Sequence, residues 1–333
     1  MKQEIELTID FVINKYLDAV RFGRSEHTFR AYKNALNVFR RVLFEQSLDP
    51  STTPIEKLTE ALAVPFVVHL NGFALATEKL YIQAIKGFYE YVNADGLAEI
   101  NVSRLRNLIR QRSRHSHVRI PKLSTSNVEL LLKFISDTQN LQNAAEFNGK
   151  LRAMRDRAFL LTLADTGLRV HEACELLCGD VIWEGGRLSF GKDGKKAVVR
   201  FSTRSMRAIK DYLSLRASLD GGSGRPLPSL PLFARHDKGA GKKIKPITPT
   251  TGRNIVAEHV EMILGAEAIG TITPHSFRHY FVTTVLKGSG NLKLAQELAR
   301  HSNIQVTQRY AHLSDDELDK GYYEIFEKKD GKA

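Results

Sequence analysis

Six side chains in the second half of this 333-residue sequence have the types and the order that phosphoryl transfer needs. They are Arg169, Lys192, His275, Arg278, His301 and Tyr310. Guanidinium groups can neutralise phosphate oxygens, and a phenol oxygen can attack phosphorus to form a covalent intermediate. A histidine or a lysine can then move the protons. Because no metal-binding carboxylate cluster accompanies them in the sequence, the positive charge must come from the protein, which indicates DNA strand exchange rather than nuclease chemistry.

Arg169 lies in the segment ADTGLRVHEACELL. Gly167 allows a tight turn, and Thr166 is a candidate cap for the next helix, which would place Arg169 in the first helical turn. There the helix dipole and the unpaired N–H groups favour an anion. Glu172, three residues further on, can brace Arg169 from the same face. Taken alone, an arginine beside a helix start is more often an ordinary surface residue.

The segment TPHSFRHYFVTT begins with a strong helix start, because Thr273 can cap it and Pro274 suits the first helical position. His275 and Arg278 are three residues apart and share a face, which suits binding and proton transfer at one phosphate. His279 could instead form a zinc pair with His275. The Glu of an HExxH pattern is missing between them, which argues against a metal.

Tyr310 follows His301 by nine residues, and Arg309 and His312 flank it. Those neighbours favour a polar setting over the buried position that a tyrosine usually takes. Lys192 stands at a predicted hairpin tip, in FGKDGKK, where an exposed lysine ordinarily has no special role.

Together, and in this order, these residues resemble the tyrosine recombinases, also called the phage integrase family. The matching residues are Thr166-Gly167-Leu168-Arg169, Glu172, Gly191-Lys192, His275-x-x-Arg278, His301 and Tyr310. The segment SEHTFRAYKNALNVF is similar to the family's core-binding domain. Three residues depart from the family pattern: Arg300 replaces a glycine, His171 a serine and Asp193 the second hairpin glycine. The last change leaves open whether Lys192 or Lys195 is the hairpin acid.

The resemblance implies site-specific DNA recombination without metal, nucleotide or other cofactor. Tyr310 would attack the scissile phosphate to give a 3′-phosphotyrosyl link and a free 5′-hydroxyl, and the hydroxyl of a second strand would reverse the step. Two alternatives stay open: DNA relaxation by a type IB topoisomerase-like enzyme, and a catalytically silent DNA-binding regulator on the same fold.

The resemblance also implies a role for each remaining site residue. Arg169, Arg278 and His301 would hold the phosphate oxygens, and Glu172 would orient rather than react. Lys192 would protonate the departing 5′-oxygen, and His275 would accept or relay the tyrosine proton.

Charge and composition agree with a nucleic-acid partner. The net charge is +12 and the isoelectric point is near 9.6, which favours a polyanion through phosphate neutralisation. A membrane surface is the weaker reading, since no helix pairs a Lys-rich face with a strongly apolar one. We find no signal peptide and no membrane span, and expect a cytoplasmic protein. Cys174 and Cys178 are expected as buried thiols on one helix, because two cysteines do not complete a zinc site.

The apolar patterns predict a mainly α fold with a small antiparallel β-sheet. Helices are expected at 8–20, 25–43, 58–70 and 76–92, then at 127–138, 151–163, 170–177, 206–216, 251–264, 274–286, 291–300, 303–311 and 314–327. Three short strands are expected in VIWEGG, RLSFG and AVVRFS. With the resemblance, this gives a helical core-binding (SAM-like) domain at 1–110, a basic linker at 111–122 and an α+β catalytic domain at 123–333.

Basic residues outside the candidate site are expected to contact DNA, against the plainer alternative that they are solvated. They are Arg24, Arg30, Lys33, Lys86, Arg112, Arg114, Arg119, Lys122, Lys242 and Lys243. The case is best for the linker, because no Asp or Glu occurs between Asn101 and Val128.

The expected partners are double-stranded DNA with a specific recombination site and further copies of the chain. Recombination needs four active sites, so the resemblance implies a tetramer on two duplexes. The tail helix 314–327 would dock on a neighbouring protomer, or alternatively pack on its own domain.

Overall fold

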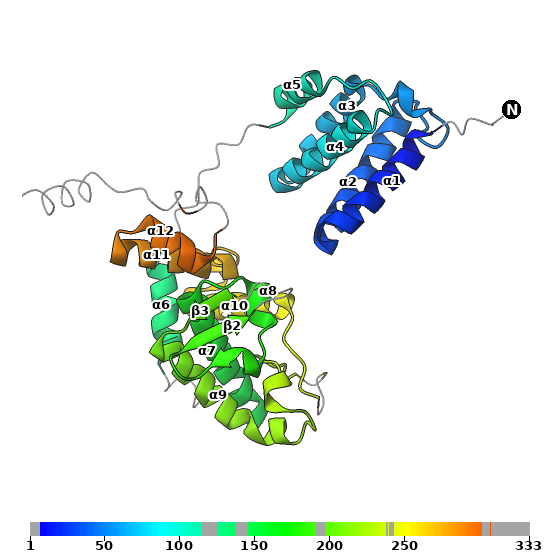
Figure 1. Ribbon diagram of the computed structural model, residues 1–333. Coiled ribbons are helices and arrows are strands. Elements are labelled where there is room, and N and C mark those ends of the chain that lie inside the picture. The colour runs from blue at the N-terminus through cyan, green and yellow to red at the C-terminus, as the bar shows by residue number, and fades with distance from the viewer. Residues whose placement is uncertain are drawn as a thin grey trace, which may run out of the picture. The chain divides into compact units, whose positions relative to one another are not determined.

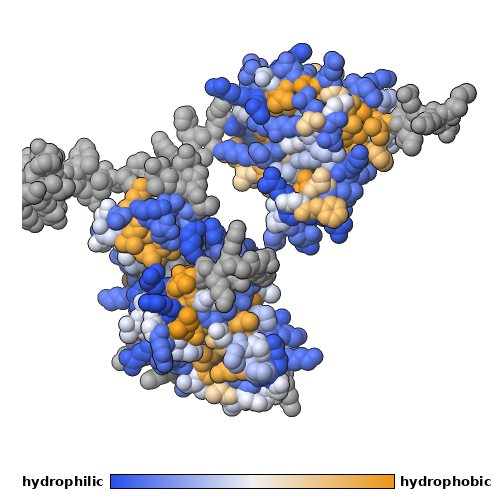
Figure 2. Space-filling view, viewed as in Figure 1, coloured by the Kyte–Doolittle hydropathy of each residue, from blue (hydrophilic) through white to orange (hydrophobic). Residues whose placement is uncertain are grey.

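The computed structural model describes residues 7–114, 125–137, 146–190, 197–237, 239, 243–301 and 307. The chain divides into two compact units, Met1–Arg119 and Ile120–Ala333 (Figure 1). The division falls inside the segment 111–122, for which a linker was predicted. Each unit has its own apolar core, and its visible face is largely hydrophilic with smaller apolar patches (Figure 2). None of the helices within the described ranges is long and apolar enough to cross a lipid bilayer.

The first unit is a helical bundle. Its described helices are α1 (Ile9–Gly23), α2 (Glu26–Glu45), α3 (Ala63–His69), α4 (Leu75–Ala94) and α5 (Val102–Arg112), with 3₁₀ turns at Ile55–Lys57, Glu60–Leu62 and Leu70–Gly72. Thr8, Ser25 and Asn101 each accept a backbone N–H from three residues later, which fixes where α1, α2 and α5 begin. The buried ring of Phe39 meets those of Phe66 and Phe88 edge-on in the core.

Helix α5 was not predicted, so the four helices expected between residues 8 and 92 were one fewer than the described part of the first unit contains. Its sequence VSRLRNLIRQR is mostly basic and polar, which hid the two apolar residues that matter. Leu105 and Ile109 stand four residues apart, are buried, and pack the helix against α3 and α4.

The second unit is mainly helical around one buried helix. Its described helices are α6 (Thr125–Ser136), α7 (Phe147–Thr166), α8 (Val170–Cys174), α9 (Thr203–Gly221), α10 (Pro249–Leu264), α11 (Pro274–Ser289) and α12 (Leu292–Ala299), with 3₁₀ turns η5 (Cys178–Asp180), η6 (Leu227–Ser229) and η8 (Ala266–Ala268). Helix α7 is buried around most of its circumference and packs against α6, α8, α9 and α11. The predicted helices at 303–311, apart from Thr307, and at 314–327 lie outside the described residues.

The small antiparallel sheet was predicted correctly. Its strands β1 (Val181–Ile182), β2 (Arg187–Phe190) and β3 (Ala197–Arg200) pair in that order. Val181, Leu188 and Val199 lie opposite one another in register and face the core. The mainly α fold with a small sheet is therefore confirmed. The hairpin connection that carries Lys192 and Lys195 lies outside the described residues.

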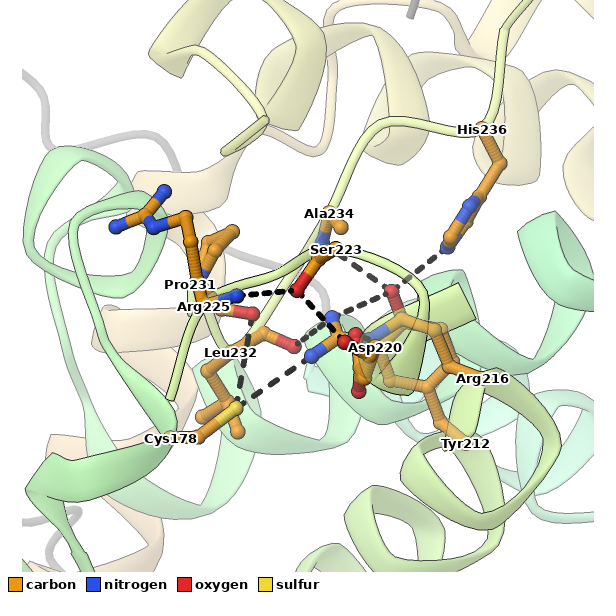
Figure 3. A network of polar contacts seen from close by, with 10 residues as sticks. All are labelled: Cys178, Tyr212, Arg216, Asp220, Ser223, Arg225, Pro231, Leu232, Ala234 and His236. Atoms are coloured by element: carbon orange, nitrogen blue, oxygen red, sulfur yellow. Dashed lines mark hydrogen bonds and ion pairs between the residues drawn. The ribbon is translucent and has the colours of Figure 1, made fainter. Parts of the chain in front are cut away.

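A buried polar network ties α9 to the segment that follows η6 (Figure 3). Arg216 is fully buried and donates to Asp220, to the Tyr212 hydroxyl and to the Leu232 carbonyl. The Tyr212 oxygen also accepts the Ala234 N–H, so its own proton is donated to His236 Nε2 at 2.8 Å. A buried arginine is tolerated here because an anion and several acceptors surround it.

Two local predictions were wrong. The helix expected at 251–264 begins two residues earlier, at Pro249, and Thr248 caps it by accepting the Thr251 N–H at 3.1 Å. Cys174 and Cys178 are buried and free as expected, but they do not share a helix, because α8 ends at Cys174 and Cys178 begins η5.

Candidate active site

Arg169 is placed by a sharp turn between α7 and α8. Gly167 ends α7 in the left-handed conformation at φ 61°, and an added Cβ would lie 2.5 Å from the Phe281 ring. Thr166 does not cap α8 as predicted: its hydroxyl donates back to Thr162 O at 2.6 Å and accepts the Leu168 N–H at 3.3 Å, both before α8 begins. Arg169 is itself the residue that precedes α8, rather than a member of its first turn.

Glu172 braces Arg169, as its spacing predicted. Its Oε2 accepts the Arg169 backbone N–H at 2.7 Å, and its Oε1 accepts Arg169 Nη1 at 3.0 Å. A second arginine, Arg300, donates Nη2 to the same Oε2 at 3.1 Å. Burial would raise the pKa of Glu172, but the Arg169 backbone bond and the charges of Arg300 and Arg169 outweigh it and lower the pKa.

Arg278 lies in the first turns of α11 and is 3% exposed. Thr273 and Pro274 begin this helix, as predicted. The guanidinium donates Nη1 to Gly167 O at 2.6 Å and Nη2 to Ala299 O. It therefore holds the end of α7 and the end of α12 against α11, and its position is fixed before any ligand arrives.

His301 follows α12 and contacts Arg278. Its Nε2 accepts Arg278 Nε at 3.3 Å, and its Nδ1 lies 2.8 Å from the Thr307 hydroxyl oxygen. Because Nε2 is the acceptor, Nδ1 carries the proton and donates it to Thr307. Burial, followed by the charge of Arg278, lowers the pKa of His301 to about 4, so the ring is neutral at neutral pH.

His275 shares α11 with Arg278 and packs edge-on against His279, with ring centroids 4.4 Å apart. Burial, then the charges of Arg278 and Arg169, lowers the pKa of His275. Burial, then His275, lowers the pKa of His279 to about 4. Within the described ranges these rings do not join a third His, Cys, Asp or Glu side chain in a metal-binding group.

Arg169, Glu172, His275, Arg278 and His301 thus converge from three segments far apart in the sequence. The contacts of Arg278 with Gly167 and His301 join the segments, and the pKa values of His275 and His301 are lowered by burial first and by the nearby arginine charges second. Two guanidinium groups beside neutral imidazoles can bind an oxyanion and accept a proton. Tyr310, Lys192 and Lys195 lie outside the described residues.

The residues predicted to contact DNA differ in their exposure and in their ion pairs. Arg24, Arg30, Lys33, Arg112 and Lys243 are exposed, Lys86 is half-buried, and Arg119, Lys122 and Lys242 lie outside the described residues. Arg30 is paired with Glu26 at 2.9 Å. Arg114 is bound to its own unit, because its backbone N–H and its Nε donate to the buried carboxylate of Glu78.

Three residues that contact the cluster were not predicted to do so: Thr307, His279 and Arg300. Thr307 accepts the Nδ1 proton of His301, but nothing in VTQRY marks that threonine. His279 was weighed only as a metal ligand. Arg300 was noted as a departure from the family pattern, and its contact with Glu172 across 128 positions was not foreseen.

Comparison with known proteins places this chain in a family. The model of the phage integrase family matches residues 122–317. Tyrosine recombinase XerC of Pelobacter propionicus is 30% identical over 312 residues, which cover 93% of this chain and 91% of that protein. Tyrosine recombinase XerA of Pyrococcus horikoshii is 27% identical over 317 residues, covering 94% and 93%.

Solved structures share the fold at lower identity. The Tn1549 transposon integrase, in complex with a circular intermediate DNA, superposes with a TM-score of 0.65 at 17% identity, covering 96% of this chain and 99% of that one. The XerH site-specific recombinase, bound to its difH substrate, gives 0.64 at 20% identity, covering 93% and 83%. Since the family model spans more than half of the chain, this protein belongs to the phage integrase family and is a Xer-like tyrosine recombinase, an enzyme of site-specific recombination.

Proposed function

We propose that this chain cuts and rejoins DNA at specific sites through a 3′-phosphotyrosyl intermediate, with no metal ion or nucleotide. The observation that carries the proposal is the convergence of Arg169 and Arg278 on one site lined by neutral imidazoles. Arg278 is held by two backbone carbonyls, so its charge needs little reorganisation when negative charge develops on a phosphate.

The electron and proton steps are those that the residue types and the family membership suggest. The Tyr310 oxygen attacks phosphorus, the bond from phosphorus to the 5′-oxygen breaks, and the 5′-oxygen leaves as a hydroxyl. His275 accepts the tyrosine proton, and a lowered pKa keeps it neutral and ready to do so. Lys192, or Lys195 in its place, supplies the proton to the 5′-oxygen. The reverse attack by a 5′-hydroxyl of another strand restores the phosphodiester.

His301 changes its protonation in this scheme. In the DNA-free protein its Nε2 accepts from Arg278, so the ring cannot donate there to a phosphate. A phosphodiester anion beside the ring raises its pKa, so Nε2 gains a proton and donates to the anion. The Arg278 Nε–H then loses its acceptor on His301 and donates to the same anion, while both Nη atoms stay bound to their carbonyls. Thr307 continues to hold Nδ1–H throughout.

The remaining proposals concern how DNA is held. The exposed basic residues of the first unit, and the exposed Lys243 of the second unit, contact the phosphate backbone. The segment 111–122, between the domains 1–110 and 123–333, contacts it as well. Four protomers assemble on two duplexes, with the segment 314–327 of each docked on the next.

A nicked suicide duplex tests the chemistry, with its site enriched from a random DNA pool by the purified protein. The parent protein should form an adduct that survives denaturation, in the presence of EDTA. The adduct should vanish in Tyr310→Phe and persist in the matched control Tyr322→Phe. An adduct that persists in Tyr310→Phe, or one that needs a divalent ion, contradicts the proposal. Relaxation of supercoiled DNA that lacks the site would favour a topoisomerase instead.

A further inference from the structure

Arg300 adopts a backbone conformation that suits glycine. It ends α12 at φ 55°, and Ser47 is the only other non-glycine residue in the described part of the chain with a positive φ. An L-residue with a large side chain is strained there. Such strain persists where the surrounding contacts hold the residue in place.

The side chain of Arg300 reaches the site rather than solvent. Its guanidinium and the Glu172 carboxylate are each 17% exposed, and Nη2 donates to Oε2 at 3.1 Å. Arg169 is 46% exposed, so it lies on the open side of the same carboxylate. One carboxylate therefore stands between a largely buried arginine and a half-exposed arginine.

The two oxygens of Glu172 are divided between the two arginines. Oε2 accepts the Arg169 backbone N–H and Arg300 Nη2, whereas Oε1 accepts Arg169 Nη1. Within the described part of the chain, the Arg169 side chain makes its hydrogen bond through Nη1 alone. Without Arg300, Oε2 would keep the Arg169 backbone N–H and could accept a second N–H of the Arg169 guanidinium, which would complete a bidentate pair with this carboxylate. Such a pair would occupy the fork that a phosphate needs.

We infer that Arg300 is a positioning residue, which holds Oε2 of Glu172 so that the guanidinium fork of Arg169 stays available to the scissile phosphate. Arg300 acts through Glu172 and does not itself touch the phosphate. The inference deepens the proposed function and rests on it for the identity of the anion. It also has a consequence that needs no strand cleavage, namely the affinity of the cluster for a simple oxyanion.

The test uses the full chain and four variants. Arg300→Gly removes the guanidinium and suits the positive φ, and Arg300→Asn is the second variant for that position, because Asn also tolerates this conformation. Arg300→Lys restores a cation. Glu172→Gln keeps an acceptor for the Arg169 N–H but removes the charge, and it is combined with Arg300→Gly. Inorganic phosphate is the probe without DNA, followed through the imidazole NMR signals of His275 and His301.

Arg300→Gly should melt at the parent temperature or above it, yet bind inorganic phosphate about threefold to tenfold more weakly and cleave the suicide duplex about tenfold more slowly. Arg300→Asn should behave alike, and Arg300→Lys should recover most of both losses. In the Glu172→Gln background, Arg300→Gly should change either quantity less than twofold, because the residue through which it acts has been altered.

Two results would overturn the inference. One is parent-like phosphate binding and cleavage in both Arg300→Gly and Arg300→Asn. The other is a full loss in the Glu172→Gln background, which would mean that Arg300 acts on the anion directly. If the parent protein forms no DNA adduct but its phosphate affinity still depends on Arg300 through Glu172, the proposed function fails and the positioning role stands.

Discussion

Acidification tests the buried contact between Tyr212 and His236. His236 is 7% exposed, and burial, followed by the charges of Arg155 and Arg216, lowers its pKa from 6.5 to about 4. In the folded unit its Nε2 accepts the Tyr212 hydroxyl proton, so protonation would break that hydrogen bond. The perturbation is a change of pH from 7.5 to 5 in the parent protein and in His236→Gln, whose side chain accepts the hydroxyl proton but does not titrate.

The magnitude follows from the two pKa values. Between pH 6.5 and 4, His236 is protonated in the unfolded chain but not in the folded unit. Its full contribution to the free energy of unfolding is therefore present above pH 6.5 and decreases as the pH falls toward 4. At 1.36 kcal/mol per pH unit, the 1.5 units between 6.5 and 5 amount to about 2 kcal/mol for this residue. Other groups titrate in the same range, but they do so equally in His236→Gln, so the difference between the two proteins isolates His236.

Urea unfolding gives the measurement. The chain has one tryptophan, Trp183, which lies in the second unit next to Lys210, so its fluorescence reports on that unit. We expect the parent to lose about 2 kcal/mol more than His236→Gln between pH 7.5 and 5. Equal losses in both proteins would refute the reasoning, because His236 would then titrate alike in the folded and unfolded states.

Three further predictions concern the site and the first unit. DNA binding should take up protons between pH 5 and 6, because the bound phosphate raises the pKa of His301 from about 4. Calorimetry in two buffers of different ionisation enthalpy measures this proton uptake, and His301→Asn should remove it. Arg278→Lys should abolish the DNA adduct and lower the free energy of unfolding of the second unit in urea by about 2–4 kcal/mol, because an ammonium cannot reach Gly167, Ala299 and His301 together. A free energy of unfolding equal to the parent's would contradict this geometry. Arg114→Ala should speed hydrogen exchange in α4, since the Glu78 carboxylate is 1% exposed and would lose its ion pair. Arg112 is exposed, and Arg112→Ala should not have this effect. Equal exchange in the two variants would show that Arg114 does not stabilise this unit.

The sequence predicted those parts of the fold that depend on local periodicity. Helices α1, α2 and α4 bury the apolar stripes that their spacing indicated, and the three strands form and pair antiparallel as expected. Helix α5 was not predicted because its two buried apolar side chains, Leu105 and Ile109, stand among arginines and give too weak a periodic pattern. Thr166 was misjudged because its hydroxyl bonds backward to Thr162 O and forward only to the turn residue Leu168, which lies before α8.

The site was predictable in composition but not in geometry. The residue types and their order indicated phosphate chemistry, and the spacing of Glu172 indicated its contact with Arg169. No local pattern shows that Arg278 Nη1 would bind a carbonyl 111 positions away, or that Arg300 would share Glu172. Such contacts depend on how α7, α11 and α12 pack, which is a property of the whole unit.

The two arginines of the cluster differ in a way that bears on their roles. Arg278 is 3% exposed and joins the ends of α7 and α12, so its position is set by the same contacts that stabilise the unit. Arg169 is 46% exposed and is held through one carboxylate, so it can move toward a phosphate without disturbing the core. Changes at Arg278 should therefore lower stability and catalysis together, whereas changes at Arg169 should lower catalysis while leaving the unit folded. One arginine supplies a fixed charge and the other an adjustable one, which suits an anion whose geometry changes during strand exchange.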